Sequence, residues 1–334
     1  MARLDAILDK QHCGVLDRAV RNVLGTDLVL ETCAQIADGL PLASVANDHY
    51  GLRGHRRHGV HHPISNHTSL CLGAEEAARD FLSGFAIDIL NFDNKLLQAY
   101  QSAAPGYSIF YCRLIELVAV AVYKMAVLLF KQGYQIHDRE SRNAASTINL
   151  LQFPPPATLF AHYSYRARDQ YPDGVADIVG YWAENRILGG VMIFDRSEAR
   201  DDERTPEPNV YLHSDRAGVT IRVCQVIDEQ QQALVDFLMS SPVGTCPCPL
   251  SASDKNLKRF DAEYATENEA YRDIWERELP NRHKGRGARG VGGCFPDPLD
   301  YPKRALKRGE EQGGRGGSQS LLAYLAGGRA AGSG

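Results

Sequence analysis

The first half of the chain carries the hydrophobic spacing of helices. Apolar residues recur at three- and four-residue intervals over residues 1–37 and again over 74–100, which predicts amphipathic helices in both stretches. Residues 47–70 lie between them and are polar and rich in Gly and His, so we expect a loop there. A nearly continuous apolar run follows at 109–130. The pattern therefore predicts a helical region over residues 1–140.

The apolar run at 109–130 is long enough to raise the question of a membrane span. It contains Arg113, Glu116 and Lys124, and each such charge near the centre of a bilayer costs roughly 2.5–3.5 kcal/mol. Arg113 and Glu116 are three residues apart, so they can pair on one face of a helix. We therefore expect a buried central helix and no contact with a membrane.

The pattern changes after the stiff segment Phe153–Pro156. A short helix is predicted at Val175–Arg186, and another at Asp228–Met239, with Asp228 as its cap. Between them lie three strand-like runs, Leu188–Asp195, Val210–Ser214 and Val219–Val226. A further helix is predicted at 255–278, with Trp275 as its anchor. This order predicts an α+β fold, in which a three-stranded antiparallel meander with flanking helices follows a mainly helical first half.

The same pattern predicts the domain organisation. The α+β region, 150–280, is expected to pack on the helical region as one body. Residues 281–334 form a Gly/Arg-rich tail with ten Lys and Arg against four Asp and Glu. We expect this tail to be largely disordered and to make at most weak contacts with nucleic-acid phosphates.

Composition narrows the class of protein. The chain has 334 residues, of which 44% are hydrophobic, and a formal net charge of −4. These values exclude a wholly disordered chain and a chain that binds nucleic acid through its overall charge. Its eight cysteines are too few for a disulfide scaffold, and the charged N-terminus lacks the apolar core of a signal peptide. We therefore predict a cytoplasmic protein.

One region collects side chains suited to acid–base chemistry. A histidine beside carboxylates can act as a general base, and arginine can hold an anion. If the meander packs on the helix at 175–186, such groups converge on one cleft. The candidates are His162, Arg166, Asp169, Asp173, Asp177, Trp182, Glu184, Arg186, His213, Asp215 and Arg216. The alternative is that they form ion pairs at the junction of sheet and helix.

Two further groups contain metal-ligand types. Five histidines lie within thirteen residues, at His55, His58, His61, His62 and His67. Arg56 and Arg57 would repel a cation there, so we interpret the stretch as a solvated loop. Cys246 and Cys248 could bind a soft metal only with a third ligand, such as Cys294 or His283. No metal or other cofactor is predicted, and whether either group binds metal stays open.

The stretches YPDGVADIVGYWAENRILGGVMIFDRSE (171–198) and RVCQVIDEQQQALVDFL (222–238) carry a resemblance. They resemble an uncharacterised family of cytosolic proteins of filamentous ascomycetes, and the likeness implies no activity. Phosphate-binding and hydrolase motifs are absent from the sequence. We predict a non-catalytic protein that binds a small molecule or another protein. The alternative is an enzyme that acts on a small polar or anionic metabolite through the cleft.

Overall fold

A computed structural model describes residues 4–48, 63–137, 157–196, 209–216, 219–241, 243–265, 267 and 269–273. All of them lie in one compact unit, Met1–Gly292. In this described part the α-helices are α1 Lys10–Leu24, α2 Asp27–Asp38, α3 Ala43–Asp48, α4 Ala74–Gly84, α5 Asn94–Ser102, α6 Ser108–Gln132, α8 Val175–Leu188 and α9 Asp228–Met239. Short 3₁₀ turns lie at η1 Leu4–Ala6, η3 Pro63–Asn66, η4 Ile87–Ile89 and η5 Ala262–Tyr264. The strands are β1 Val191–Asp195, β2 Val210–His213, β3 Val223–Gln225, β4 Arg259–Phe260 and β5 Ala270–Tyr271.

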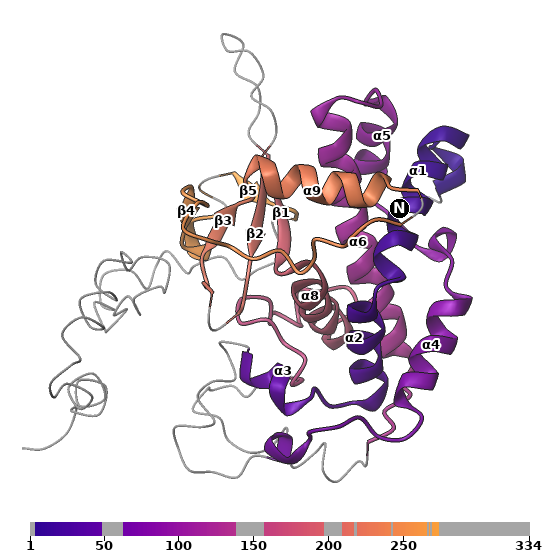
Figure 1. Ribbon diagram of the computed structural model, residues 1–334, viewed down its shortest axis with the longest axis vertical. Coiled ribbons are helices and arrows are strands. Elements are labelled where there is room, and N and C mark those ends of the chain that lie inside the picture. The colour runs from indigo at the N-terminus through magenta and orange to yellow at the C-terminus, as the bar shows by residue number, and fades with distance from the viewer. Residues whose placement is uncertain are drawn as a thin grey trace, which may run out of the picture. The chain divides into compact units, whose positions relative to one another are not determined.

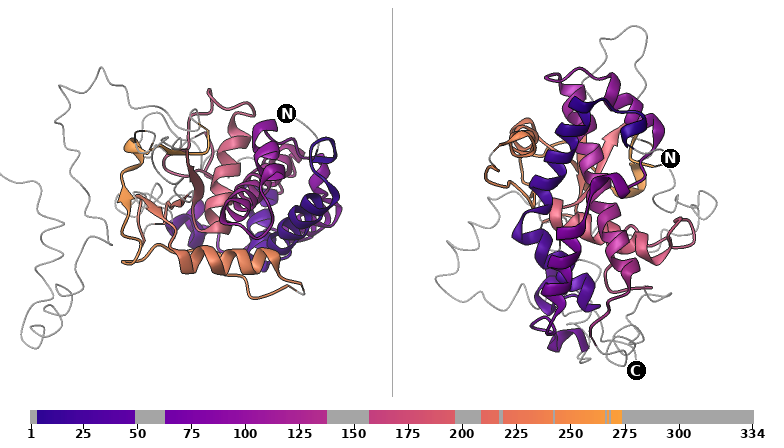
Figure 2. Two further views of the ribbon diagram at one scale, coloured as in Figure 1. Left: turned by 90° about the horizontal axis from the view of Figure 1, so that it is seen from above. Right: turned by 90° about the vertical axis from the view of Figure 1, so that its right-hand side faces the viewer.

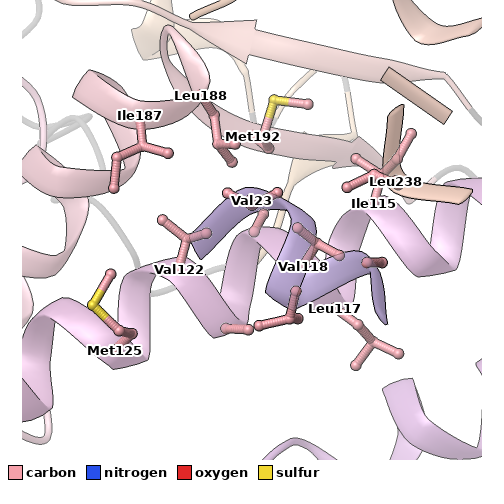
Figure 3. Packing of buried hydrophobic residues seen from close by; sticks show 14 of the residues in the cluster. Val23, Ile115, Leu117, Val118, Val122, Met125, Ile187, Leu188, Met192 and Leu238 are labelled. Carbon is pink, nitrogen blue, oxygen red and sulfur yellow. The ribbon is translucent and has the colours of Figure 1, made fainter. Parts of the chain in front are cut away.

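The long helix α6 is the centre of the hydrophobic core. Side chains from α1, α8, β1 and α9 surround it, and Figure 3 shows Val23, Ile187, Met192 and Leu238 packed about it. The predicted pair also forms, because Arg113 Nη1 donates to Glu116 Oε2 at 2.8 Å. The prediction of a buried central helix is confirmed. None of the helices that the structure describes combines the length and apolar character needed to cross a bilayer.

Helix α8 packs between α6 and the sheet. In Figures 1 and 2 the sheet lies on one side of α8, and helices α1, α2 and α4 lie on the other. Most residues of α8 are buried, so it has no polar face to show to solvent, as expected of a helix enclosed on all sides. Gly180 allows α6 to come close, since a Cβ there would lie 2.7 Å from Tyr123 Cδ2. This tight packing fixes the residues at both ends of α8.

Within the described residues, the sheet has five antiparallel strands in the order β4-β3-β2-β1-β5. The α+β class and the three central strands agree with the prediction. Both faces are buried: Met192 and Phe194 enter the large core, whereas Val191 and Ile193 pack against a second cluster rich in tyrosine. Burial on both faces explains the uninterrupted apolar run of β1.

The predicted three-stranded sheet is wrong in its strand number, because β4 and β5 extend it at both edges. The predicted helix over 255–278 is also wrong where the structure describes this segment, since the two edge strands and η5 lie there. Each edge strand is only two residues long, too short to show alternation. Trp275 and the tail 281–334 lie outside the described residues, so the predicted domain boundaries at 140, 150 and 280 stay predictions.

Candidate metal centre

Four potential metal ligands from distant parts of the chain meet at one end of the helical layer. They are Asp38, His67, Cys71 and His137, and their ligand atoms all lie within 4.8 Å of one another. Asp38 ends α2, His67 follows η3, Cys71 precedes α4 and His137 follows α6. In Figure 1 this cluster is located at the end of α2 from which the chain continues into α3.

Backbone contacts fix the His67 ring. Its Nδ1 lies 3.0 Å from the carbonyl oxygen of Pro41, and the Ala43 amide donates to the His67 carbonyl at 2.8 Å. A carbonyl oxygen can only accept, so Nδ1 carries a proton, and when the ring is neutral Nε2 presents a lone pair. Metal-binding histidines are commonly oriented in this way, by a hydrogen bond from the nitrogen remote from the metal.

The lone pair of His67 faces the carboxylate of Asp38. Nε2 lies 2.7 Å from Asp38 Oδ2, and these side chains are 5% and 0% exposed. Neither Asp38 oxygen nor His67 Nε2 has a hydrogen-bond partner within the described part of the chain. Buried acceptors that face one another without a proton between them are costly. A cation held by both would remove that cost.

Cys71 and His137 are the other two members of the cluster. Cys71 Sγ lies 3.1 Å from His137 Nδ1, which in turn lies 3.9 Å from Asp38 Oδ1. The chain after α6 is held against the end of α2, because the His137 amide donates to the Asp38 carbonyl at 2.7 Å and the Ile136 amide to Ala37 at 3.1 Å. The four ligands are therefore positioned by backbone hydrogen bonds as well as by packing.

The ligand set fits zinc best. Tetrahedral zinc with bonds of about 2.0–2.3 Å places its ligand atoms roughly 3.3–3.8 Å apart. The separations of 3.1 Å between Cys71 Sγ and His137 Nδ1 and 3.9 Å between His137 Nδ1 and Asp38 Oδ1 lie near that range, whereas the 2.7 Å between His67 Nε2 and Asp38 Oδ2 is shorter. Imidazole and thiolate favour zinc over magnesium or calcium, which prefer oxygen ligands. One carboxylate and one thiolate would also balance the two positive charges of the ion, so the buried centre would be neutral.

The interpretation of the histidine-rich stretch as a solvated loop is wrong for His67, which is 7% exposed. His55, His58, His61 and His62 lie outside the described residues. The spacing of His67 and Cys71, H-x₃-C, is the only local signal of the centre. Asp38 and His137 are far away in sequence, and nothing in their own surroundings marks them as ligands.

The structure brings together two residues of the predicted cleft, His162 and His213. Their ring centroids are 4.8 Å apart, and each residue is 1% exposed. His162 accepts at Nδ1 from the Ser164 amide at 3.1 Å, so its Nε2 donates to the His213 carbonyl at 3.0 Å. The Tyr165 hydroxyl lies 3.1 Å from His213 Nδ1. Both imidazoles therefore belong to a buried hydrogen-bond network.

Asp215 lies beside this network and is fully buried. Its Oδ2 accepts from the Tyr163 amide at 2.9 Å, and its own amide donates to Asn185 Oδ1 at 3.1 Å. The Arg166 guanidinium lies over the Tyr163 ring, 5.0 Å from its centroid. Burial lowers the pKa of Arg166, and the charge of Asp215 opposes that shift. These two candidates thus join the histidines on one side of the sheet.

Asp173 and Asp177 form a separate group at the start of α8. The Tyr123 hydroxyl donates to Asp177, Lys131 pairs with Asp173, and the Asp173 amide donates to Asp177 Oδ2 at 2.7 Å. Burial raises the pKa of Asp177. These contacts anchor the end of α6 to the beginning of α8.

The other five candidates have partners elsewhere. Trp182 packs against Phe160. Three of the candidates form ion pairs: Glu184 with Arg272, Arg186 with Glu31, and Arg216 with Asp48. The exposed Asp169 lies 3.3 Å from Arg168. The candidates therefore fall into several groups. Only the group around His162 and His213 contains more than two of the candidate residues. A catalytic cleft stays a prediction.

Searches against protein-family models, curated proteins and solved structures give no match. The resemblance to the ascomycete family stays a prediction.

Proposed function

We propose that this protein is a non-catalytic binding protein whose ligand is a zinc ion held by Asp38, His67, Cys71 and His137. The observation that carries the proposal is the contact between His67 Nε2 and Asp38 Oδ2, 2.7 Å apart with no hydrogen bond. Two further ligand atoms surround this pair within 4.8 Å. A protonated His67 paired with Asp38 is the competing explanation, and it requires no metal.

Four protein ligands favour a structural role over a catalytic one. Structural zinc sites are closed by four side chains, whereas catalytic sites keep one position for water or substrate. Here Asp38 ends α2, whereas the other three ligands lie outside the helices: His67 after η3, Cys71 before α4 and His137 after α6. An ion at this point would hold together segments of the chain that lie as far apart in sequence as Asp38 and His137.

The cytoplasmic location expected from the sequence fits this proposal. A thiolate ligand must stay reduced, and all seven cysteines that the structure describes are free thiols. Reducing compartments preserve that state. The protein or small-molecule partner expected from the sequence would then dock on a fold whose helical end is held by the metal.

Elemental analysis of the purified full-length chain tests the proposal. We expect about one zinc ion per chain, as one closed four-ligand centre requires. His67→Ala and Cys71→Ala should each lose more than about 90% of that zinc, because loss of even an outer-shell partner costs 10–100-fold in affinity.

Cys13→Ala is the matched control, since Cys13 is a half-buried thiol outside the cluster, and it should keep the full zinc content. Protein that stays free of zinc after dialysis against the ion would contradict the proposal, as would full zinc content in both ligand variants.

A further inference from the structure

An open groove lies between helices α1 and α4 on the surface of the described part of the chain. Its volume is about 320 Å³, at the lower end of the range in which proteins bind small molecules. Both helices and the segments that follow them supply its walls. The four metal ligands are not among its lining residues, so the groove is a separate feature of the fold.

Half of the lining is apolar. Of the lining side chains, Val20 and Ile87 are buried, whereas Leu24, Leu82 and Phe85 are half-buried. All five belong to the main hydrophobic core or pack against it. This surface is therefore fixed by the packing of the fold, and an apolar ligand that covered it would remove it from water.

Charged side chains line the groove from both helices. Arg21 of α1 and Arg79 of α4 lie against it, and Asp17 is the one carboxylate among the described lining residues. Arg21 Nε donates to Asp17 Oδ1 at 3.0 Å, and Arg79 Nη2 donates to Glu75 Oε1 at 2.5 Å. These side chains are 39% to 77% exposed, and ion pairs at such exposure are weak. Since a guanidinium has five N–H donors, each arginine can also bind a further carboxylate.

The carboxyl ends of α1 and α4 also lie beside the groove, and such helix ends carry a partial negative charge. Amides occupy some of their carbonyl oxygens: the Gly25 amide donates to the Arg21 carbonyl at 2.9 Å, and the Phe85 amide to the Leu82 carbonyl at 3.3 Å. The two guanidinium groups carry full charges and outnumber the one lining carboxylate. The groove is therefore complementary to a ligand that combines an apolar part with an anionic group.

We propose that this groove binds a free medium-chain fatty acid, with the alkyl chain on the apolar lining and the carboxylate at Arg21 and Arg79. On α1 the lining extends from Asp17 to Leu24, which corresponds to about 10 Å at 1.5 Å per residue. A linear chain suits a groove of that length. Binding to a bilayer requires an apolar face that enters the lipid, whereas this apolar surface lies in a recess. The ligand is therefore the free acid and not a membrane lipid.

The test titrates the purified full-length protein with octanoate, decanoate and decyltrimethylammonium, and follows methyl resonances by NMR. Decanoate should bind saturably and shift the methyl signals of Val20, Leu24 and Leu82. It should bind at least about fivefold more tightly than octanoate, because each fully buried methylene contributes about a factor of four. Decyltrimethylammonium carries a chain of the same length and the opposite charge, so it should bind at least about tenfold more weakly than decanoate.

Substitution of both arginines, Arg21→Gln with Arg79→Gln, should weaken decanoate binding at least about tenfold, since hydrogen bonds to charged groups are among the stronger ones. Both side chains are exposed, so the fold should persist. Arg18→Gln is the matched control: Arg18 is an exposed arginine of α1 that does not line the groove, and this variant should bind as wild type does.

Three outcomes would overturn the proposal. The first is the absence of saturable decanoate binding, or methyl shifts that fall outside the groove. The second is equal binding of decanoate by the double variant, or binding of decyltrimethylammonium as tight as that of decanoate. The third is a different occupant: sedimentation with phosphatidylserine vesicles that depends on Arg21 and Arg79 would assign the groove to membranes, and binding of an acidic amphipathic peptide but not of decanoate would assign it to a protein partner.

Discussion

Chelation of zinc should lower the melting temperature of the wild-type protein and leave that of His67→Ala unchanged. A ligand that binds only the folded state at 1,000 times its dissociation constant contributes about 4 kcal/mol. For a unit of this size each kcal/mol corresponds to roughly 2–4 °C, so the expected drop is about 10 °C. Differential scanning calorimetry with and without a chelator measures it.

The decisive quantity is the difference caused by the chelator, because His67→Ala also disturbs packing. His12→Ala is the matched control, because His12 is another buried histidine and lies outside the metal centre. Its ring nitrogens lie 3.0 Å from Asp9 Oδ1 and 3.2 Å from the Ala103 carbonyl oxygen. That variant should be less stable and should still lose stability on chelation. If the chelator has no effect on wild type, the metal does not hold the fold together.

Glu184→Gln should be among the most destabilising single substitutions in the chain. Both Glu184 oxygens bind the Arg272 guanidinium, at 3.1 and 3.0 Å, and Oε1 also accepts from the Met192 amide at 2.9 Å. The two side chains are 0% and 10% exposed. Neutralising the carboxylate removes the negative charge that this guanidinium binds, and breaking a buried ion pair costs about 3–5 kcal/mol. The urea midpoint of unfolding measures the loss.

Glu75→Gln is the comparison for that substitution. Glu75 pairs with Arg79 at 2.5 Å, but both side chains are more than half exposed, and such pairs contribute less than about 1 kcal/mol. Equal shifts in the two variants would show that solvent reaches Arg272 and that the pair at the end of α8 is not a core contact.

The sequence predicts the elements whose patterns are long and regular. The helix predicted at 109–130 corresponds to α6. Its apolar positions continue over about six turns and are interrupted by only a few charged residues. The strands β1 to β3 appear because their apolar runs are bounded by turn residues. The predicted start of the first strand, at Leu188, is wrong. In the structure α8 ends at Leu188, and the chain turns at Gly189 before β1 begins. Apolar residues alone do not separate a buried helix end from a strand.

The candidate centre is mostly invisible in the sequence for a different reason. Asp38 has the pattern of a polar residue at the end of an amphipathic helix, and His137 is a single histidine after another helix. Only tertiary packing of α2 against the chain that follows α6 brings them to His67 and Cys71. In the predicted cleft, the sequence correctly brings His162 and His213 together. It does not show that packing beside the sheet buries both rings.

The most direct test of the centre is a titration of metal-free protein with cobalt(II), which replaces zinc in tetrahedral sites and absorbs visible light. One equivalent should produce the strong visible bands of tetrahedral cobalt together with a near-ultraviolet band from a thiolate ligand, and zinc should remove both. Cys71→Ser should lose the thiolate band, whereas Cys246→Ser should keep it. Weak absorption typical of six-coordinate cobalt, or a thiolate band that persists without Cys71, would contradict the four-ligand centre.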